Sequence, residues 1–451
     1  MKAKGLDVRL WVGLIVLLVI FLTLGANASA ADEIEVGVIA PMKFMGGEAI
    51  WNGAQFAADE INAAGGIRIK GKRYQIALHK TDDNCFSSVQ DAVSAMQRLV
   101  TVKKVDFVIG GYRSEAVLAQ QEVMADNKVI FLGVAAAHDE LSARVAKDYD
   151  RYKYWFRVCP TRSTEMGKNY IAMTEPVLRA LTKLGIKKPK VAILADKAHW
   201  ADPMVELATK LYPQMGCEVI GVWRPSWNAT SVTAELSAIK SAGAHMIFQM
   251  TAGPAGNVYS KQWGELMIPA ALTGTNIEGF KESHWKTTSG KCNYMMTGDS
   301  IATAEKTEKT RPFLAAYSKR FGEDPTSNGV GAYDALNLLK EAIERAGSFD
   351  VDAVIPELEK TDYIGPTGRI TFTPVGHETP HNVIWGPNNI TMVGMQWRNG
   401  ERCVFWPDGR EIHPAILATG GVPRGWDKIR YEGTTDYVLP PWVVEYWKDK
   451  K

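Results

Sequence analysis

The fold is decided by Ile34-Glu-Val-Gly-Val-Ile-Ala40 and, after a short loop, by Ala54-Gln-Phe-Ala-Ala-Asp-Glu-Ile-Asn-Ala-Ala-Gly-Gly-Ile67. The first segment is apolar too continuously for a strand with one wet face, which predicts a strand covered on both faces, as in a parallel sheet. Apolar residues from Trp51 to Ile61 recur every three or four positions, which predicts an amphipathic helix. Gly65-Gly66 then allow the left-handed conformation that ends a helix.

The segment before this unit has the features of a secretory leader. Lys2, Lys4 and Arg9 precede the apolar run Leu10–Leu24, and small residues follow at Ala28-Ser-Ala30. This order predicts a signal peptide, residues 1–30, cut after Ala30. The apolar run is short for a membrane span, which needs about 20 residues, although an uncleaved anchor stays as the alternative.

Composition limits the class of partner. The chain has 451 residues, 52 Lys and Arg, and 50 Asp and Glu. Removal of residues 1–30 leaves equal numbers of acidic and basic residues, so there is no electrostatic footprint for nucleic acid or an anionic membrane. The length predicts more than one domain. The five cysteines include no CxxC pair, which gives no support to a zinc or dithiol site, and whether two of them form a disulfide stays open.

Strand and helix patterns alternate along most of the chain, which predicts parallel, doubly wound sheets in two lobes. The expected strands are Tyr74–Lys80, Val105–Gly110, Val129–Val134, Tyr154–Val158, Val191–Ala195, Val219–Trp223, Met246–Met250 and Ala270–Gly274. The expected helices are Ser87–Thr101, Glu115–Asp126, Thr164–Leu184, Met204–Gln214, Val232–Ala242 and Ala255–Leu266.

The pattern after Asp299 is mainly helical, with helices expected at Arg311–Phe321, Gly331–Ala346 and Val351–Leu358. Asn399-Gly400 between two apolar runs predicts a β-hairpin. The last forty residues are rich in Pro, Gly and Trp without a helical period. Because disordered segments rarely carry so many aromatic residues, we expect this tail to pack over a lobe.

Four short motifs, in this order, resemble the type I periplasmic binding proteins of the leucine/isoleucine/valine-binding kind. They are Asp59-Glu-Ile-Asn-Ala-Ala-Gly-Gly-Ile67, Phe156-Arg-Val-Cys-Pro160, Tyr333-Asp-Ala-Leu336 with Ala342-Ile-Glu-Arg-Ala-Gly347, and Gly365-Pro-Thr-Gly-Arg-Ile-Thr-Phe372. The resemblance implies a two-lobed α/β fold, each lobe a doubly wound sheet, with three crossovers near Val158, Asp299 and Ile390. The implied division is residues 31–157 with 299–388, residues 158–298 with 389–410, and a C-terminal extension, residues 411–451.

The resemblance also implies a ligand site in the cleft between the lobes. Gly110-Gly-Tyr-Arg113-Ser114 joins a strand to a helix, and the family's serine at the position of Ser114 receives the ligand carboxylate; the alternative is a plain helix cap. The family uses a backbone contact at Ala135 and commonly a threonine where Ala137 stands, so backbone N–H groups remain, with His138 nearby as a candidate or as an ordinary surface histidine.

In the second lobe, Trp200 matches an aromatic residue that stacks on the ligand in the family; otherwise it packs within its own lobe. Phe44 is a candidate wall in the first lobe. The family's amino-acid binders carry a glutamate for the ligand's ammonium, but the matching position here is read as Asn276, with Glu278 two residues on. An amide pairs an ammonium less well than a carboxylate does. An amine-free carboxylate, an amide or a urea-like molecule therefore competes with an amino acid as ligand.

One motif suggests a different class. His377-Glu378-Thr-Pro-His381 has the spacing of zinc peptidases, but the spacing places both histidines on one face only within a helix. Pro380 inside the motif opposes a helix. A zinc-dependent hydrolase is therefore a remote alternative. The main expectation is a non-enzymatic, periplasmic solute receptor without cofactor or metal. We expect a monomer that serves the permease and ATPase subunits of an ABC importer; a ligand-sensing subunit for a membrane receptor is the other alternative.

Overall fold

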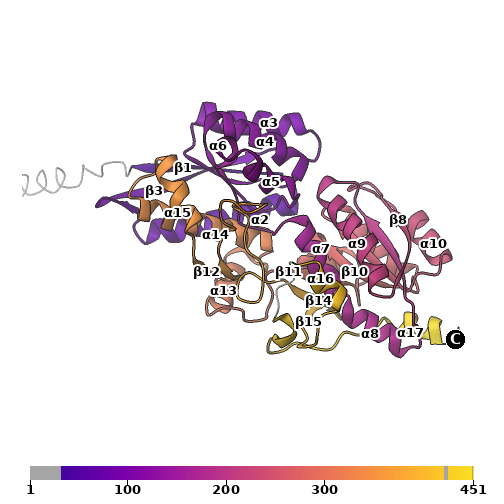
Figure 1. The fold of residues 1–451 in the computed structure, drawn as a ribbon. Helices are drawn as coiled ribbons and strands as arrows, with labels where there is room; N and C mark the ends of the chain where they lie inside the picture. Colours follow the sequence, from indigo (N-terminus) through magenta and orange to yellow (C-terminus); the bar gives the residue numbers. More distant parts are fainter. Residues whose placement is uncertain (1–31, 421–424, 449, 451) are drawn as a thin grey trace, which may run out of the picture.

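The computed structural model describes residues 32–420, 425–448 and 450, and these form two lobes (Figure 1). The predicted leader, residues 1–30, lies outside the described residues. Each lobe contains a mainly parallel sheet flanked by helices, so the predicted two-lobed α/β fold is confirmed.

The sheet of the first lobe has the strand order β2-β3-β1-β4-β5-β6, and only the β2–β3 pair is antiparallel. Its strands are β1 (Glu33–Ala40), β2 (Ile67–Ile69), β3 (Lys72–Asp82), β4 (Phe107–Gly110), β5 (Ile130–Gly133) and β6 (Trp155–Arg157). Strand β1 lies between β3 and β4, with Val36 opposite Leu78 and Phe107. Its apolar side chains are buried on both faces, as the continuous apolar run predicted.

Helices from two distant parts of the chain cover this sheet. They are α2 (Met45–Ala63), α3 (Val89–Gln97) with the π-helical turn η1 (Arg98–Lys103), α4 (Ser114–Asn127), α5 (Glu140–Lys147), α6 (Tyr149–Tyr152), α13 (Thr310–Phe321), α14 (Ser327–Ala346) and α15 (Val351–Glu359). Helices α2 and α14 meet closely, because a Cβ on Gly53 would lie 1.8 Å from the carbonyl oxygen of Gly329.

The second lobe has a four-stranded parallel sheet in the order β10-β9-β7-β8. Its strands are β7 (Lys190–Ala195), β8 (Glu218–Trp223), β9 (Met246–Thr251) and β10 (Ala271–Asn276). Its helices are α7 (Ser163–Ala172), α8 (Glu175–Lys183), α9 (Asp202–Gln214) with the preceding turn η2 (His199–Ala201), α10 (Thr233–Ser241), α11 (Ala255–Glu265), η3 (Ile277–Phe280) and α12 (Ser283–Thr287). The single helix expected over Thr164–Leu184 is wrong: Pro176, in the first turn of α8, has no N–H to continue α7.

A third, antiparallel sheet joins β11 (Met296–Asp299) to the hairpin β14 (Val393–Arg398) and β15 (Glu401–Trp406). Asn399 and Gly400 turn this hairpin with φ of 51° and 93°, so the predicted hairpin is confirmed. A shorter hairpin, β12 (Tyr363–Gly365) and β13 (Gly368–Ile370), lies between α15 and β14.

The chain passes between the lobes three times, after β6, after β11 and before β14. The second and third of these segments are tied together by Lys306, a partly buried residue whose Nζ donates to the carbonyl oxygen of Ser300 (2.6 Å) and to that of Thr391. Burial lowers the pKa of Lys306 to about 7, and the nearby Asp299 carboxylate opposes that shift.

The C-terminal extension covers the second lobe. It contains α16 (Pro414–Ala418), the turn η4 (Trp426–Lys428) and α17 (Pro441–Lys448). The indole N–H groups of Trp442 and Trp447 donate to the carbonyl oxygens of Ile268 (3.0 Å) and Pro269 (2.5 Å). The Trp442 ring also lies 5.2 Å from that of Trp263. The tail therefore packs on a lobe, as its aromatic content predicted.

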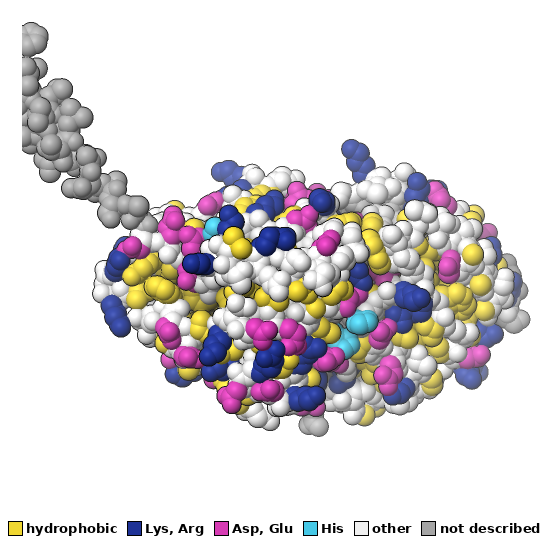
Figure 2. Space-filling view, turned by 90° about the horizontal axis from the view of Figure 1, so that it is seen from above, with side chains coloured by type: hydrophobic (Ala, Val, Ile, Leu, Met, Phe, Trp, Pro, Cys, Tyr) yellow, Lys and Arg dark blue, Asp and Glu magenta, His cyan; other side chains and the backbone are white. Residues whose placement is uncertain are grey.

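The five cysteines all lie in the described part of the chain and are free, four of them buried. Among the described residues, no helix has the length and apolar character that a membrane crossing needs. Acidic and basic side chains are interspersed over the face seen from above (Figure 2).

Candidate functional site

A cavity lies between the two lobes, where the strands of both sheets end. It encloses about 820 Å³, including its opening to solvent. Both lobes and the crossover segments line it, through Phe86, Tyr112, Arg113, Ser114, Ala135, Ala137, Pro160, Met166, Tyr170, Asp196, Ala198, Trp200, Trp227, Ala252, Thr275, Ile277, Phe280, Asp299, Ser300, Ser327, Asn328, Trp385 and Met392. Its mainly apolar wall suits a small organic molecule.

The N-terminus of α4 is at the wall of this cavity. Gly110 and Gly111 both have positive φ, and a Cβ on Gly110 would lie 2.0 Å from the carbonyl oxygen of Ile39, so the approach to the helix requires glycine. Ser114 is the first helical residue and not the cap, which corrects the cap interpretation. Its Oγ instead accepts a hydrogen bond from the N–H of His138 (3.2 Å).

Arg113 lines the cavity, but its charge is paired within the protein. The guanidinium pairs with Glu115 and donates to the carbonyl oxygens of Cys85 (3.3 Å) and Phe86 (3.4 Å). An arginine held in this way supports the wall of the cavity and brings little free positive charge to it.

The loop after β5 places Ala135 and Ala137 at the cavity and His138 outside its lining. The carbonyl oxygen of Ala137 accepts from the N–H of Ser163 (2.7 Å) and from Arg157 (3.0 Å). The His138 ring lies 6.2 Å from the ring of His199 of the other lobe, and burial lowers its pKa. His138 thus contributes its backbone N–H to Ser114, and its side chain lies beside the site.

Aromatic side chains from both lobes form one wall. Trp200 lies in η2 with 9% of its surface exposed and lines the cavity. Phe44 does not line it; its ring lies 4.5 Å from that of Phe86, which does. Phe86 in turn lies 4.6 Å from Trp227 of the second lobe.

Tyr112 and Trp227 are cavity residues that the sequence analysis missed. The Tyr112 hydroxyl donates to the carbonyl oxygen of Ala252 in the second lobe (3.3 Å), so this hydrogen bond joins the lobes. Burial and the nearby Glu278 carboxylate raise the pKa of Tyr112, which keeps it a donor. The tyrosine stands two residues before Ser114, and that proximity was the available signal.

Asn276 does not face the cavity, which corrects its interpretation as the residue opposite a ligand ammonium. Its side-chain amide is fully buried and donates to the carbonyl oxygen of Gly256 (2.9 Å) and to Ser260 Oγ (3.0 Å). Because successive strand residues point to opposite faces, Thr275 and Ile277 line the cavity instead. Glu278 is not among the residues that line the cavity; its carboxylate accepts from Asn257 (2.7 Å) and lies close enough to Tyr112 to raise the pKa of that hydroxyl.

Two carboxylates line the cavity, and both are bonded to the protein. Asp196 accepts from the N–H of Ala252 (2.8 Å) and the hydroxyl of Tyr259 (3.2 Å), and burial raises its pKa to about 6. Asp299 accepts from the N–H groups of Ser300 (2.6 Å) and Ser327 (3.1 Å). Each carboxylate thus accepts two hydrogen bonds from the protein, and three of the four donors are backbone N–H groups.

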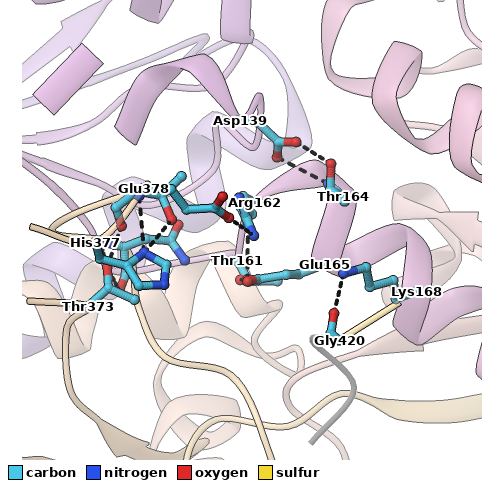
Figure 3. Close-up of polar contacts among 12 residues, drawn as sticks. Asp139, Thr161, Arg162, Thr164, Glu165, Lys168, Thr373, His377, Glu378 and Gly420 are labelled. Carbon is cyan, nitrogen blue, oxygen red and sulfur yellow. Dashed lines mark hydrogen bonds and ion pairs between the residues drawn. The ribbon is translucent and has the colours of Figure 1, made fainter. Parts of the chain in front are cut away.

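The zinc interpretation of His377, Glu378 and His381 is wrong because the motif forms turns and not a helix, and its side chains bond to different partners. Figure 3 shows His377 and Glu378 pointing to separate partners. His377 contacts Thr379, and Glu378 pairs with Arg162 (2.8 Å). The His381 ring stacks on Phe156 at 4.0 Å and bonds to Glu359 (2.9 Å). Among the described residues, no cluster of three or more His, Cys, Asp or Glu side chains could hold a metal ion.

Comparison with known proteins agrees with this geometry. The sequence profile of the periplasmic binding protein family matches residues 33–386, so the chain belongs to that family, within its leucine/isoleucine/valine-binding-protein-like, type I branch. The family consists of solute-binding proteins and not of enzymes. The Leu/Ile/Val-binding protein homolog 7 of Brucella abortus is 23% identical over 88% of this chain and 97% of its own.

Solved structures share the fold. The leucine-binding protein of Thermotoga maritima has a TM-score of 0.65 at 22% identity and covers 82% of this chain and 97% of its own. A branched-chain amino acid binding protein of Streptococcus pneumoniae, solved with isoleucine, has a TM-score of 0.66 at 23% identity. The match covers 82% of this chain and 98% of that protein. An ABC transporter solute-binding protein of R. palustris, solved with benzoate, has a TM-score of 0.68 at 16% identity. The match covers 82% of this chain and 95% of that protein.

Proposed function

We propose that this protein is the periplasmic receptor of an ABC importer and that it captures an organic carboxylate or amide lacking an ammonium group. The observation that carries the proposal is the cavity between the lobes, which has the N-terminus of α4 at one wall and aromatic rings at another. The apolar leader supports export, and the family supports permease and ATPase subunits as partners.

The polar groups of the cavity support an amine-free ligand. An ammonium group needs acceptors, ideally a free carboxylate. Asn276 is turned into the second lobe, while Asp196 and Asp299 are engaged by backbone N–H groups. A carboxylate or amide oxygen, in contrast, suits the Ser114 hydroxyl and the positive end of the α4 dipole.

The aromatic wall supports a planar or bulky apolar body. Phe86, Trp200 and Trp227 present ring surface to the cavity from both lobes. Structural neighbours that bind benzoate, hydroxybenzoate and 3,4-dihydroxybenzoate, as well as one that binds isoleucine, share the fold. Ligand held by both lobes favours the closed arrangement and so raises its population.

A thermal-shift screen on the purified mature protein tests this function. The panel pairs benzoate, 4-hydroxybenzoate and aliphatic carboxylates with their amides and with leucine, isoleucine and valine. We expect carboxylates or amides to raise the unfolding temperature in a concentration-dependent manner, because a ligand bound only to the folded state stabilises it. Stabilisation by the free amino acids alone would contradict the proposed ligand class.

A further inference from the structure

We propose that Arg157 is a positioning residue that makes the cavity select an anionic ligand, acting through a hydrogen-bonded chain that ends at Ser114. The inference rests on the proposed function and goes further, since it states which end of the cavity carries positive potential and why. Arg157 belongs to the motif Phe156-Arg-Val-Cys-Pro160.

Arg157 is fully buried at the end of β6 and has no carboxylate of its own. Its Nη1 donates to the carbonyl oxygen of Ala137 (3.0 Å) and its Nη2 to that of His138 (2.6 Å). Among the residues that the structure describes, no acidic oxygen lies within ion-pair distance of this guanidinium, and its Nε has no partner. A buried cation without a paired anion is costly, which suggests that a ligand anion offsets it.

The two nearest acidic side chains are engaged elsewhere (Figure 3). Asp139 accepts from the N–H (3.1 Å) and the hydroxyl of Thr164 at the start of α7. Glu165 accepts from Thr161 and pairs with Arg162 (3.1 Å), which also pairs with Glu378. Both acids weaken the field of Arg157, but each is shared with other donors.

A continuous path leads from the guanidinium to the cavity. Arg157 donates to the C=O of the peptide group between Ala137 and His138, and the N–H of that same group donates to Ser114 Oγ (3.2 Å). Each hydrogen bond polarises the next in the same direction. The Ser114 hydroxyl, which donates to no acceptor within the described chain, therefore becomes a stronger donor toward a ligand oxygen at the α4 N-terminus.

The other cations around the cavity are compensated. Arg113 pairs with Glu115, and Arg162 with Glu165 and Glu378. Lys306 lies next to Asp299 at the crossover segments. Burial lowers the pKa of Arg157 to about 10, which still leaves it charged at neutral pH. Arg157 is thus the described cation whose field is least cancelled near Ser114.

The test compares benzoate with benzamide, which have nearly the same shape and differ in charge. Dissociation constants of both are measured by calorimetry for the wild type, Arg157→Met, Arg157→Lys and Arg162→Met. We expect the wild type to prefer benzoate and Arg157→Met to lose roughly tenfold of that preference, the size that one partly screened charge gives at an effective dielectric constant near 20. Arg157→Lys should retain most of it.

Arg162→Met is the matched control, because it removes a neighbouring but neutralised charge and should leave the benzoate-to-benzamide ratio unchanged. A purely structural role for Arg157 would weaken both probes equally in Arg157→Met and in Arg157→Lys. That result, with a wild-type preference for benzoate, would overturn this inference and leave the proposed function standing. A wild type that binds neither probe nor any other member of the screening panel would overturn both.

A measurement on the wild type covers the case in which Arg157→Met does not fold. Benzoate labelled with ¹³C at its carboxyl carbon is bound and titrated by NMR. Positive potential should keep the bound carboxylate ionised at pH values where free benzoate is already protonated. A bound carboxylate that protonates at a higher pH than free benzoate would refute the inference without any variant.

Discussion

The contact between α2 and α14 makes Gly53 a sensitive position for both stability and binding. In Gly53→Ala the new methyl group would lie 1.8 Å from the carbonyl oxygen of Gly329, so the helix backbones must separate by more than about 1 Å. Overpacking of this kind costs about 3 kcal/mol, and the better helix propensity of alanine returns about 1 kcal/mol. We therefore expect a net loss of about 2 kcal/mol in the free energy of unfolding.

The displacement should also reach the cavity. Asn328, which precedes Gly329, lines the cavity and donates to the carbonyl oxygen of Val134 (3.0 Å). Separation of the helices moves this contact, so ligand affinity should fall together with stability. Denaturant unfolding and ligand titration of the same preparation measure the two effects.

Gly167→Ala in α7 is the matched control, because the close contacts of its new methyl group would be with the flexible side chains of Leu207 (3.0 Å) and Met204 (3.3 Å), and the nearest backbone atom, Met204 Cα, lies at an ordinary contact distance of 3.5 Å. Here the helix propensity should dominate, with no loss of stability. If Gly53→Ala were as stable as the wild type while Gly167→Ala behaved as expected, the close approach of α2 and α14 would be refuted.

Three further outcomes are expected. Trp200→Ala should weaken ligand binding by roughly 50-fold in calorimetry, since about 100 Å² of ring contact is lost; unchanged affinity would remove Trp200 from the site. Burial lowers the pKa of His284 to about 3 and of His245 to about 4, so the unfolded chain binds more protons below pH about 6.5. These two histidines should therefore lower the free energy of unfolding as the pH drops from 6.5 to 4, while buried acids of raised pKa, such as Asp196, act in the opposite direction. The free energy of unfolding of the wild type minus that of His245→Gln should fall over this range; a constant difference would contradict this. Trp442→Ala should lower the unfolding temperature by several degrees without changing ligand affinity, whereas no shift would show that the tail does not stabilise the lobe.

Much of the architecture follows from local sequence patterns. The covered strand β1, the glycine exit of α2 and the Asn399-Gly400 turn each depend on residues close in sequence, so periodicity and turn chemistry predict them. The break between α7 and α8 was missed because its apolar period continues across Pro176. The position of the tail was predictable only as packing on some lobe; Trp442 meets Trp263 through contacts that no local pattern encodes.

The site was predictable where a strand runs directly into a helix. Ser114, Ala135 and Ala137 line the cavity because parallel strands end at one edge of a sheet. The prediction for Asn276 was wrong because strand residues alternate between the two faces of a sheet. An alignment error of one position therefore assigns to the cavity a side chain that points into the lobe interior. Tyr112 and Trp227 meet their partners only across the cleft, a proximity that depends on how the lobes are placed together.

The Lys306 ammonium holds the carbonyl groups of two segments that lie far apart in the sequence, Ser300 and Thr391. Because both segments connect the lobes, this contact should make them move together when the lobes change their relative position. Deprotonation of Lys306 to the uncharged amine would weaken its hydrogen bonds to the two carbonyl groups. A change of one proton on Lys306 would then alter how firmly the two crossover segments are held together.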